Sequence, residues 1–168
     1  PTIVHMGPFG NIAHGCSSII ADKLAINCGD YVVTEAGFGA DLGFEKFMDI
    51  KVRQGGPKPS AAVVVATIRG LKWHGGVAIK DMAAANPEAV RRGGENLKNA
   101  LRIVGLYGLP AIVAINRFPT DTAEEIAVVK EVAMAAGAIG VEEAKGFAEG
   151  GDGMIELAHV VVKAADQP

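Results

Sequence analysis

Long hydrophobic runs and a large excess of one charge are both missing from this sequence. No apolar run approaches the ~20 residues with which a helix crosses a bilayer. The net charge is only −3, and acidic and basic residues are interspersed. A nucleic-acid-binding surface or a patch for anionic membranes would need a basic excess. We therefore expect neither nucleic acid nor a membrane as a partner.

Cysteine is scarce as well, with Cys16 and Cys28 as its only occurrences. Both fall in one stretch that we expect to be helical, which would separate them by ~18 Å and place them beyond disulfide reach. No spacing of Cys and His matches a zinc site, so we expect no metal site. We expect both to be buried apolar thiols in a reducing compartment, which favours a cytoplasmic location.

Two nucleotide-binding motifs are absent from the sequence. GxxxxGK[ST], the P-loop, does not occur. Gly37, Gly39 and Gly43 form GxGxxxG, which differs from the GxGxxG of dinucleotide-binding folds and argues against an NAD-dependent oxidoreductase. The chain starts at Pro1 without an initiator Met or a signal-peptide pattern. We expect it to be part of a longer polypeptide.

What is present is an alternation of short β-branched runs and helical stretches. It predicts an α/β fold with a mostly parallel sheet and helices on both faces. The apolar runs within two of the strands show no alternation, as expected for strands covered on both faces. The expected strands are residues 2–5, 31–34, 61–67, 111–115 and 138–142, and the expected helices are 17–27, 43–52, 87–107, 122–136 and 153–164. We expect Asp121 or Thr120 to cap the fourth helix.

Ligands in such sheets bind at the carboxyl ends of the strands, so the loops that follow the strands predict the site. Gly10 and Gly15 precede a helix start, a spacing that fits either an anion site or a tight turn. His14 in the same loop fits either catalysis or a structural hydrogen bond. The candidates in these loops are Gly7, Pro8, Gly10, Asn11, His14, Glu35, Gly37, Gly39, Asp41, Arg69, Phe118, Pro119 and Phe147.

The later candidates also have more than one interpretation. Glu35 and Asp41 can bind a cation, orient a substrate or close their own turns. Arg69 can contact a phosphate or form a surface ion pair. Phe118 and Phe147 are large apolar side chains in loops, and two rings at one sheet edge could hold a flat ligand between them.

Several stretches, in order along nearly the whole chain, resemble the formate–tetrahydrofolate ligase family, also called formyltetrahydrofolate synthetases. EAGFGADLG and the AIN-x-FPTDT run are specific to it, not general α/β sequence. The stretches are GPFGNIAHGCSS (7–18), YVVTEAGFGADLGFEKFMDIKVR (31–53), VVVATIRGLKWHGG (63–76), PAIVAINRFPTDT (110–122) and FAEGGDGMIELA (147–158). Complete members are several times longer and carry GxxxxGKT upstream of this portion.

The resemblance implies ATP-dependent ligation of formate to tetrahydrofolate through formyl phosphate, with Mg²⁺ and possible use of K⁺ or NH₄⁺. It implies layering like that of P-loop NTPases and a homotetramer or other homo-oligomer. Folate would lie between Phe118, with Pro119 beside it, and Phe147, which replaces the family's usual Trp. The loop with Asn11 and His14 would line the pocket for ATP and formyl phosphate. We expect the catalytic residues to be His14, Asn11 and Arg69, and the residues that bind the nucleotide or its phosphates to be Gly7, Pro8, Gly10, Glu35, Gly37, Gly39 and Asp41.

The resemblance also suggests a division of the chain. Residues 1–108 would belong to the nucleotide and formyl-phosphate domain, and residues 109–168 would begin the folate-binding domain, although the two could pack as one α/β unit. An alternative function remains, namely a non-catalytic module that binds folate or assembles with another chain. A P-loop upstream of Pro1 would favour the enzyme, and its absence would favour the module.

Overall fold

The computed structural model describes residue 16 and residues 18–167. The chain forms two compact units, residues 1–59 and residues 60–168. The strand expected at residues 2–5 lies outside the described residues. The domain boundary expected between residues 108 and 109 stays a prediction.

In the first unit, helix α2 spans Ile19–Cys28 and confirms the helix expected there. It begins at Ser18, whose side-chain oxygen accepts a hydrogen bond from the backbone N–H of Ala21 at 3.1 Å, and it ends at Gly29. Cys16 lies before this helix rather than within it, and neither described cysteine forms a disulfide. The expectation that both thiols are buried was wrong, because Cys16 is only partly buried and Cys28 is exposed at the end of the helix. Burial raises the pKa of the Cys16 thiol, which keeps that thiol protonated at neutral pH.

The strand expected at residues 31–34 is not formed. The segment is without regular secondary structure and largely exposed, and the side chain of Val33 is 93% exposed. A β-strand needs a neighbouring strand to satisfy its backbone, and the described part of this unit offers none. Tyr31–Thr34 therefore have no strand to pair with in the described part of this unit, although their composition is typical of a strand.

The helix expected at residues 43–52 is present but begins earlier and is wider than an α-helix. Two π-helical segments, Ala40–Phe44 and Phe47–Val52, follow one another. Buried Lys51 lies 2.6 Å from a carboxylate oxygen of Asp22 on α2 and 4.9 Å from the centroid of the Phe47 ring. This cation joins α2 to the second π-helical segment.

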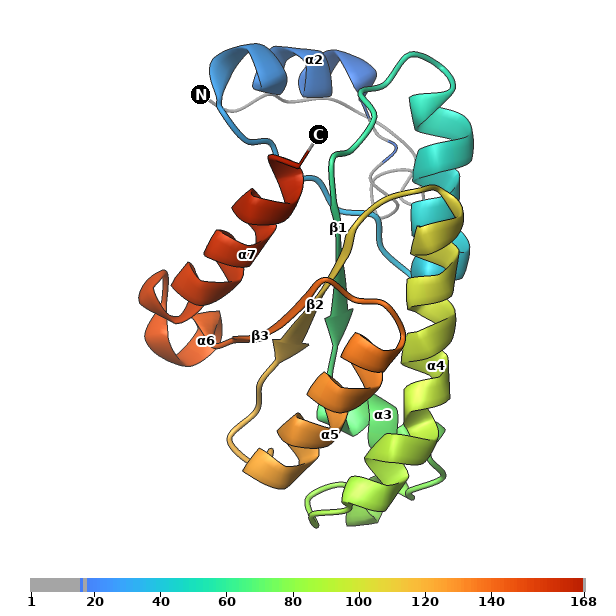
Figure 1. The fold of residues 1–168 in the computed structure, drawn as a ribbon, viewed down its shortest axis with the longest axis vertical. Helices are drawn as coiled ribbons and strands as arrows, with labels where there is room; N and C mark the ends of the chain where they lie inside the picture. Colours follow the sequence, from blue (N-terminus) through green and yellow to red (C-terminus); the bar gives the residue numbers. More distant parts are fainter. Residues whose placement is uncertain (1–15, 17, 168) are drawn as a thin grey trace. The chain divides into compact units, whose positions relative to one another are not determined.

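The second unit contains a three-stranded sheet with every strand parallel. Its strands are β1 (Ala62–Ala66), β2 (Ala111–Asn116) and β3 (Gly140–Ala144), in the spatial order β1-β2-β3 (Figure 1). Val113 at the centre of β2 pairs with Val64 of β1 and Val141 of β3. The predicted parallel α/β architecture is confirmed. Strand β3 lies two residues later than the strand expected at residues 138–142.

Helices cover both faces of this sheet, as predicted. On one face, Ile112 and Ala114 of β2 pack with Leu157 and Ala164 of the last helix. On the other face, α4 contacts β1 and β2 while α5 contacts β2 and β3. The helices of this unit are α3 (Ile68–His74), α4 (Pro87–Leu106), α5 (Ala123–Ala135), α6 (Gly146–Glu149) and α7 (Ile155–Ala165).

Coverage of both faces holds for β2 but not for β1. The residues Ala111–Ile115 are all buried, whereas Val63 and Val65 are 41% and 67% exposed. Their register partners are Ile112 and Ala114, so the two valines lie on the face that α7 covers at β2. Within the described residues α7 covers β2 and β3 but leaves the adjoining surface of β1 open.

Helices α3 and α4 approach each other with almost no side chain between them. A Cβ atom added at Gly93 of α4 would lie 1.8 Å from the carbonyl oxygen of Leu71 on α3. No side chain fits at that distance. Gly93 therefore fixes how deeply α3 packs against α4, and α3 begins directly after β1.

Candidate functional site

The carboxyl edge of the sheet brings three of the sequence-predicted site segments to one end of the second unit. β1 leads into α3, β2 leads into the loop of residues 117–122, and β3 leads through Lys145 into α6. Parallel neighbouring strands deliver these segments to the same edge. Arg69, Phe118 and Phe147 each stand on one of them.

Arg69 and Phe118 are in contact. The guanidinium carbon of Arg69 lies 5.8 Å from the centroid of the Phe118 ring, within the range of a cation–π interaction. Arg69 stands in the first turn of α3 rather than in a loop, because the hydroxyl of Thr67 accepts a hydrogen bond from Gly70 N at 3.0 Å and starts the helix there. Two predicted site residues from different strand ends are thus brought together.

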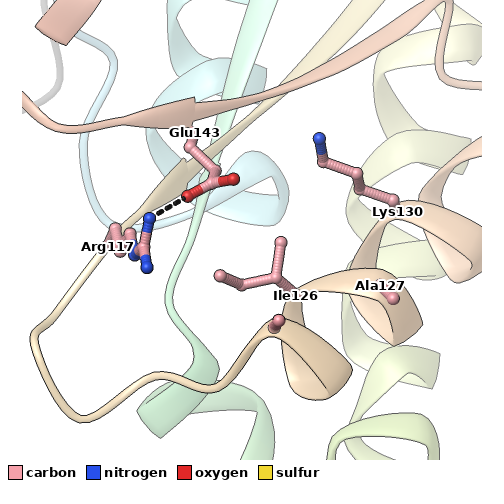
Figure 2. A pocket seen from close by; sticks show the side chains of 6 residues that line it. Arg117, Ile126, Ala127, Lys130 and Glu143 are labelled. Atoms are coloured by element: carbon pink, nitrogen blue, oxygen red, sulfur yellow. Dashed lines mark hydrogen bonds and ion pairs between the residues drawn. The ribbon is translucent and has the colours of Figure 1, made fainter.

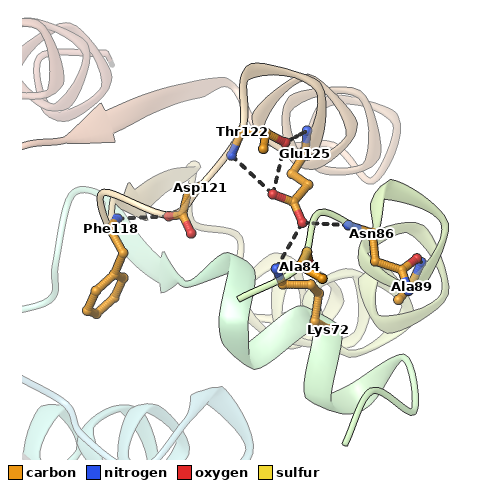
Figure 3. A network of polar contacts seen from close by, with 8 residues as sticks. All are labelled: Lys72, Ala84, Asn86, Ala89, Phe118, Asp121, Thr122 and Glu125. Carbon is orange, nitrogen blue, oxygen red and sulfur yellow. Dashed lines mark hydrogen bonds and ion pairs between the residues drawn. The ribbon is translucent and has the colours of Figure 1, made fainter. Parts of the chain in front are cut away.

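The backbone of Phe118 is held by a buried carboxylate. Oδ2 of Asp121 accepts a hydrogen bond from Phe118 N at 2.8 Å, and Asp121 N donates to Phe118 O at 3.0 Å (Figure 3). The other oxygen, Oδ1, is buried without a hydrogen-bond partner in the part of the chain that the structure describes. The expectation that Asp121 or Thr120 caps the next helix was wrong, because Asp121 closes its own loop instead.

The cap of α5 is Thr122, which forms a reciprocal pair with Glu125. Its hydroxyl accepts a hydrogen bond from Glu125 N at 3.3 Å, and Oε2 of Glu125 accepts from Thr122 N at 3.1 Å and from the Thr122 hydroxyl at 2.9 Å. Such a capping box satisfies backbone N–H groups that a helix start leaves unpaired. It also fixes where the Phe118 loop ends.

Glu125 also forms a fully buried ion pair with Lys72. Lys72 Nζ lies 3.0 Å from Oε1 of Glu125, and the two side chains are 1% and 0% exposed. Oε1 also accepts a hydrogen bond from Asn86 N at 2.9 Å, and Lys72 Nζ donates to Ala84 O at 3.1 Å (Figure 3). The pair therefore links α3 and the start of α4 to the start of α5.

The charge state of Glu125 follows from these contacts. Burial by itself would raise the pKa of this carboxyl group. The hydrogen bonds from Asn86 N, from Lys72 and from Thr122 outweigh it, so the pKa of Glu125 lies below its ordinary value. The Glu125 carboxyl group is therefore ionised at neutral pH.

Sequence reasoning missed this pair. The T-x-x-E spacing of Thr122 and Glu125 is a readable capping-box signal. Nothing in the sequence pairs Lys72 with Glu125, because the two lie on different helices far apart in the chain. Glu125 stands in the first turn of α5, yet its side chain is buried in the protein.

Phe147 stands on α6, and its side chain is fully exposed. A role as a core anchor for the final helix is thereby excluded. Among the described residues it makes no ring contact with Phe118, although β3, which precedes it, is the neighbour of β2. A shared pocket between the two rings stays a prediction, and Pro119 is an exposed neighbour of Phe118 in the loop.

A shallow hollow of about 320 Å³ lies between α5 and β3 (Figure 2). Arg117 at the end of β2 forms an ion pair with Glu143 of β3 at 2.7 Å beside it. Ile126 and Ala127 supply apolar surface, and Lys130 adds a second cation. Neither Phe118 nor Phe147 lines this hollow.

The described candidates of the first unit, Glu35, Gly37, Gly39 and Asp41, lie around the start of its first π-helical segment. Gly39 has a φ of +96°, and its carbonyl oxygen accepts from the N–H of Gly43 at 3.1 Å. A Cβ at Gly43 would lie 1.7 Å from the carbonyl oxygen of Gly37. The turn itself thus requires these glycines, while Glu35 and Asp41 are exposed beside it.

The structure does not describe the remaining candidates, and the residues that it does describe contain no metal-binding cluster. Five residues of the first loop lie outside the described part of the chain, namely Gly7, Pro8, Gly10, Asn11 and His14. Across residue 16 and residues 18–167, no three His, Cys, Asp or Glu side chains gather as a metal ion would need. In the same residues no helix has the length and apolar character to cross a membrane.

Comparison with known proteins identifies the family. The family model described as formate–tetrahydrofolate ligase matches residues 1–168. A formate–tetrahydrofolate ligase from a Sphingobium species is 59% identical over 166 residues, which cover 99% of this chain and 30% of that protein. One from Symbiobacterium thermophilum is 55% identical over 169 residues, covering 100% of this chain and 30% of the relative. The chain thus spans about three-tenths of these relatives' length, and it belongs to the formate–tetrahydrofolate ligase family.

Proposed function

We propose that this chain supplies the folate-binding edge of an enzyme that ligates formate to tetrahydrofolate with ATP. The observation that carries the proposal is the contact between Arg69 and Phe118 at the carboxyl edge of the sheet. Ligands of open α/β sheets bind at that edge. The names of the relatives supply formate and tetrahydrofolate as the substrates.

The proposed reaction has two steps. An oxygen of formate attacks the γ-phosphorus of ATP, the bond to the β-phosphate oxygen breaks, and ADP leaves formyl phosphate behind. The N10 amine of tetrahydrofolate then attacks the formyl carbon, the carbon–oxygen bond to phosphate breaks, and N10 loses its proton. The first step needs cations around the transferring phosphoryl group, and the second needs the amine and the carbonyl held close together.

In this scheme the folate ring stacks on Phe118. The ring is half-buried and its backbone is fixed by Asp121, so one aromatic face is held ready for a flat ligand. Pro119 adds an apolar surface beside it. Phe147 supplies the second face, and its full exposure leaves its ring available for such a contact.

Arg69 adds a positive charge to the same edge. We assign it to the anionic part of the reaction, where the charge that develops on phosphate needs a cation. Its contact with the Phe118 ring would keep this cation near the stacked ligand. Asn11 and His14 belong to the nucleotide and formyl-phosphate side in this proposal, together with Gly7, Pro8 and Gly10.

The described residues do not by themselves fit Mg²⁺, because no cluster of carboxylates or imidazoles occurs among them. ATP, its Mg²⁺ and the monovalent cation are therefore assigned to the remainder of the longer polypeptide and to the loop of residues 7–15. Glu35, Gly37, Gly39 and Asp41 stay candidates for that side. A cytoplasmic homo-oligomer completes the proposal.

The test is steady-state kinetics of the full-length parent enzyme with Phe118→Ala. Loss of the stacking face is expected to raise the KM for tetrahydrofolate several-fold and to leave the KM for ATP within about twofold, since aromatic stacking contributes roughly 1 kcal/mol beyond area burial. An unchanged folate KM would refute a folate site at this edge. A source polypeptide without an upstream GxxxxGKT would support the alternative of a non-catalytic folate-binding or assembly module.

A further inference from the structure

The buried pair Lys72–Glu125 connects the two elements that carry Arg69 and Phe118. Lys72 lies one helical turn after Arg69 on α3. Glu125 lies in the first turn of α5, and its cap Thr122 follows directly on the Phe118 loop. The ion pair, drawn in Figure 3, thus joins α3, which carries Arg69, to the helix that follows the Phe118 loop.

Glu125 is held more firmly than an ordinary ion-pair partner. Its two oxygens accept from Lys72 Nζ, Asn86 N, Thr122 N and the Thr122 hydroxyl, at 2.9 to 3.1 Å. Asn86 also caps α4, with its Oδ1 accepting from Ala89 N at 2.9 Å. A single carboxylate therefore fixes the starts of α4 and α5 and, through Lys72, the position of α3.

A buried ion pair is a poor source of stability, because removing two charges from water costs about as much as their attraction returns. Apolar residues of similar volume often stabilise such a site equally well. Stability alone therefore gives little reason for Lys72 and Glu125 to occupy this position. The fixed positions of α3, α4 and α5 give a better reason for this pair, because its hydrogen bonds are directional and apolar side chains could not form them.

We propose that Lys72 and Glu125 are positioning residues that set Arg69 against Phe118 and so hold the folate-stacking surface in its binding geometry. This inference rests on the proposed folate site at Phe118. The pair lies outside the ligand-contacting loop. It keeps α3 and the Phe118 loop in a fixed position relative to each other. Neither residue would touch the substrate.

The test compares three variants of the full-length parent enzyme. Glu125→Gln leaves Lys72 buried without a full counter-charge, and it is expected to lower Tm and raise the folate KM. The double variant Lys72→Met/Glu125→Leu removes both charges, and it is expected to restore much of the Tm while the folate KM stays raised several-fold. The control Arg91→Gln/Glu131→Gln removes an exposed ion pair at 2.8 Å between α4 and α5. It is expected to leave the KM for folate and the KM for ATP unchanged.

A recovered Tm together with a raised folate KM in the double variant would support the positioning role. A double variant with recovered Tm and a wild-type folate KM would overturn the positioning role. Should the double variant fail to fold, Thr122→Val and Thr122→Ser provide the same test, because only Ser keeps the hydroxyl that bonds Glu125. Serine is expected to keep the folate KM and valine to raise it, and equal behaviour of the two would contradict the inference.

A crystal structure of the double variant separates this inference from the proposed function. The distance from the Arg69 guanidinium to the Phe118 centroid is expected to exceed the ~6 Å limit of a cation–π contact. An unchanged distance would refute positioning whatever the ligand is. A lengthened distance combined with an unaffected folate KM in Phe118→Ala would support positioning and refute the folate site.

Discussion

The guanidinium of Arg69 lies over the Phe118 ring, with 5.8 Å between its central carbon and the ring centroid. One residue follows β1 and the other follows β2, and both strands end at the same edge of a parallel sheet. The contact turns two separate strand ends into one surface with an aromatic face and a cation.

Replacing Arg69 by Met should weaken the contact with Phe118 while keeping side-chain length. An exposed cation–π contact contributes about 0.5–1 kcal/mol, which corresponds to roughly a two- to fivefold rise in the folate KM. Steady-state kinetics of the parent enzyme would measure it, with Arg69→Lys as the control that keeps the charge. A drop in kcat is expected as well, because Arg69 is assigned to the charge that develops on phosphate. A variant with wild-type kcat and wild-type folate KM would contradict both roles.

Replacing Phe147 by Ala should raise the folate KM several-fold and leave ATP binding nearly unchanged. Because the side chain is fully exposed on α6, its removal should not lower Tm. Phe147→Trp should be tolerated or should improve affinity, since Trp offers a larger stacking face. An Ala variant with the wild-type folate KM would exclude Phe147 as the second stacking face for folate.

Acidification should destabilise the protein through Glu125. The pKa of this carboxyl is lowered in the folded state, so its contribution is fully present above the unfolded value of 4.5 and is lost as pH falls through the lowered folded pKa. Denaturant unfolding at neutral pH and below pH 4.5 would show it. In Glu125→Gln the free energy of unfolding should depend less on pH across that range, and an identical dependence would argue against the assignment.

Two glycines of α4 should respond in opposite directions to alanine. Gly93→Ala places a Cβ against the carbonyl of Leu71, so helix α3 must move and about 1–3 kcal/mol or more of stability should be lost. Gly105→Ala meets no atom within 4 Å and should stabilise the helix by about 0.5–1 kcal/mol. Thermal unfolding of the two variants would check both signs, and similar effects would contradict the close helix packing.

Segments with strong local signals were predicted correctly from the sequence. α4 has Pro87 in its first turn and Gly108 just past its end, and β2 is a continuous apolar run that is buried on both faces. The sheet-edge rule also placed Arg69 and Phe118 at one edge before any contact was known. Local chemistry and topology sufficed for these features.

Features that depend on a distant partner were not predictable in this way. Residues 31–34 carry the composition of a strand, but a strand exists only where another strand pairs with it. Helix α3 was missed because it is short, contains Gly70 and owes its start to the Thr67 cap. The Lys72–Glu125 pair depends on two helices meeting, which no local pattern encodes.

The uncovered surface of β1 has a practical consequence for work with residues 60–168 alone. Val63 and Val65 form an apolar stripe on the edge strand of the described sheet. Open edges with apolar side chains are templates for pairing between molecules. A preparation of this unit should form aggregates as its concentration rises, and a single Val65→Lys substitution should keep it dispersed without altering the carboxyl edge.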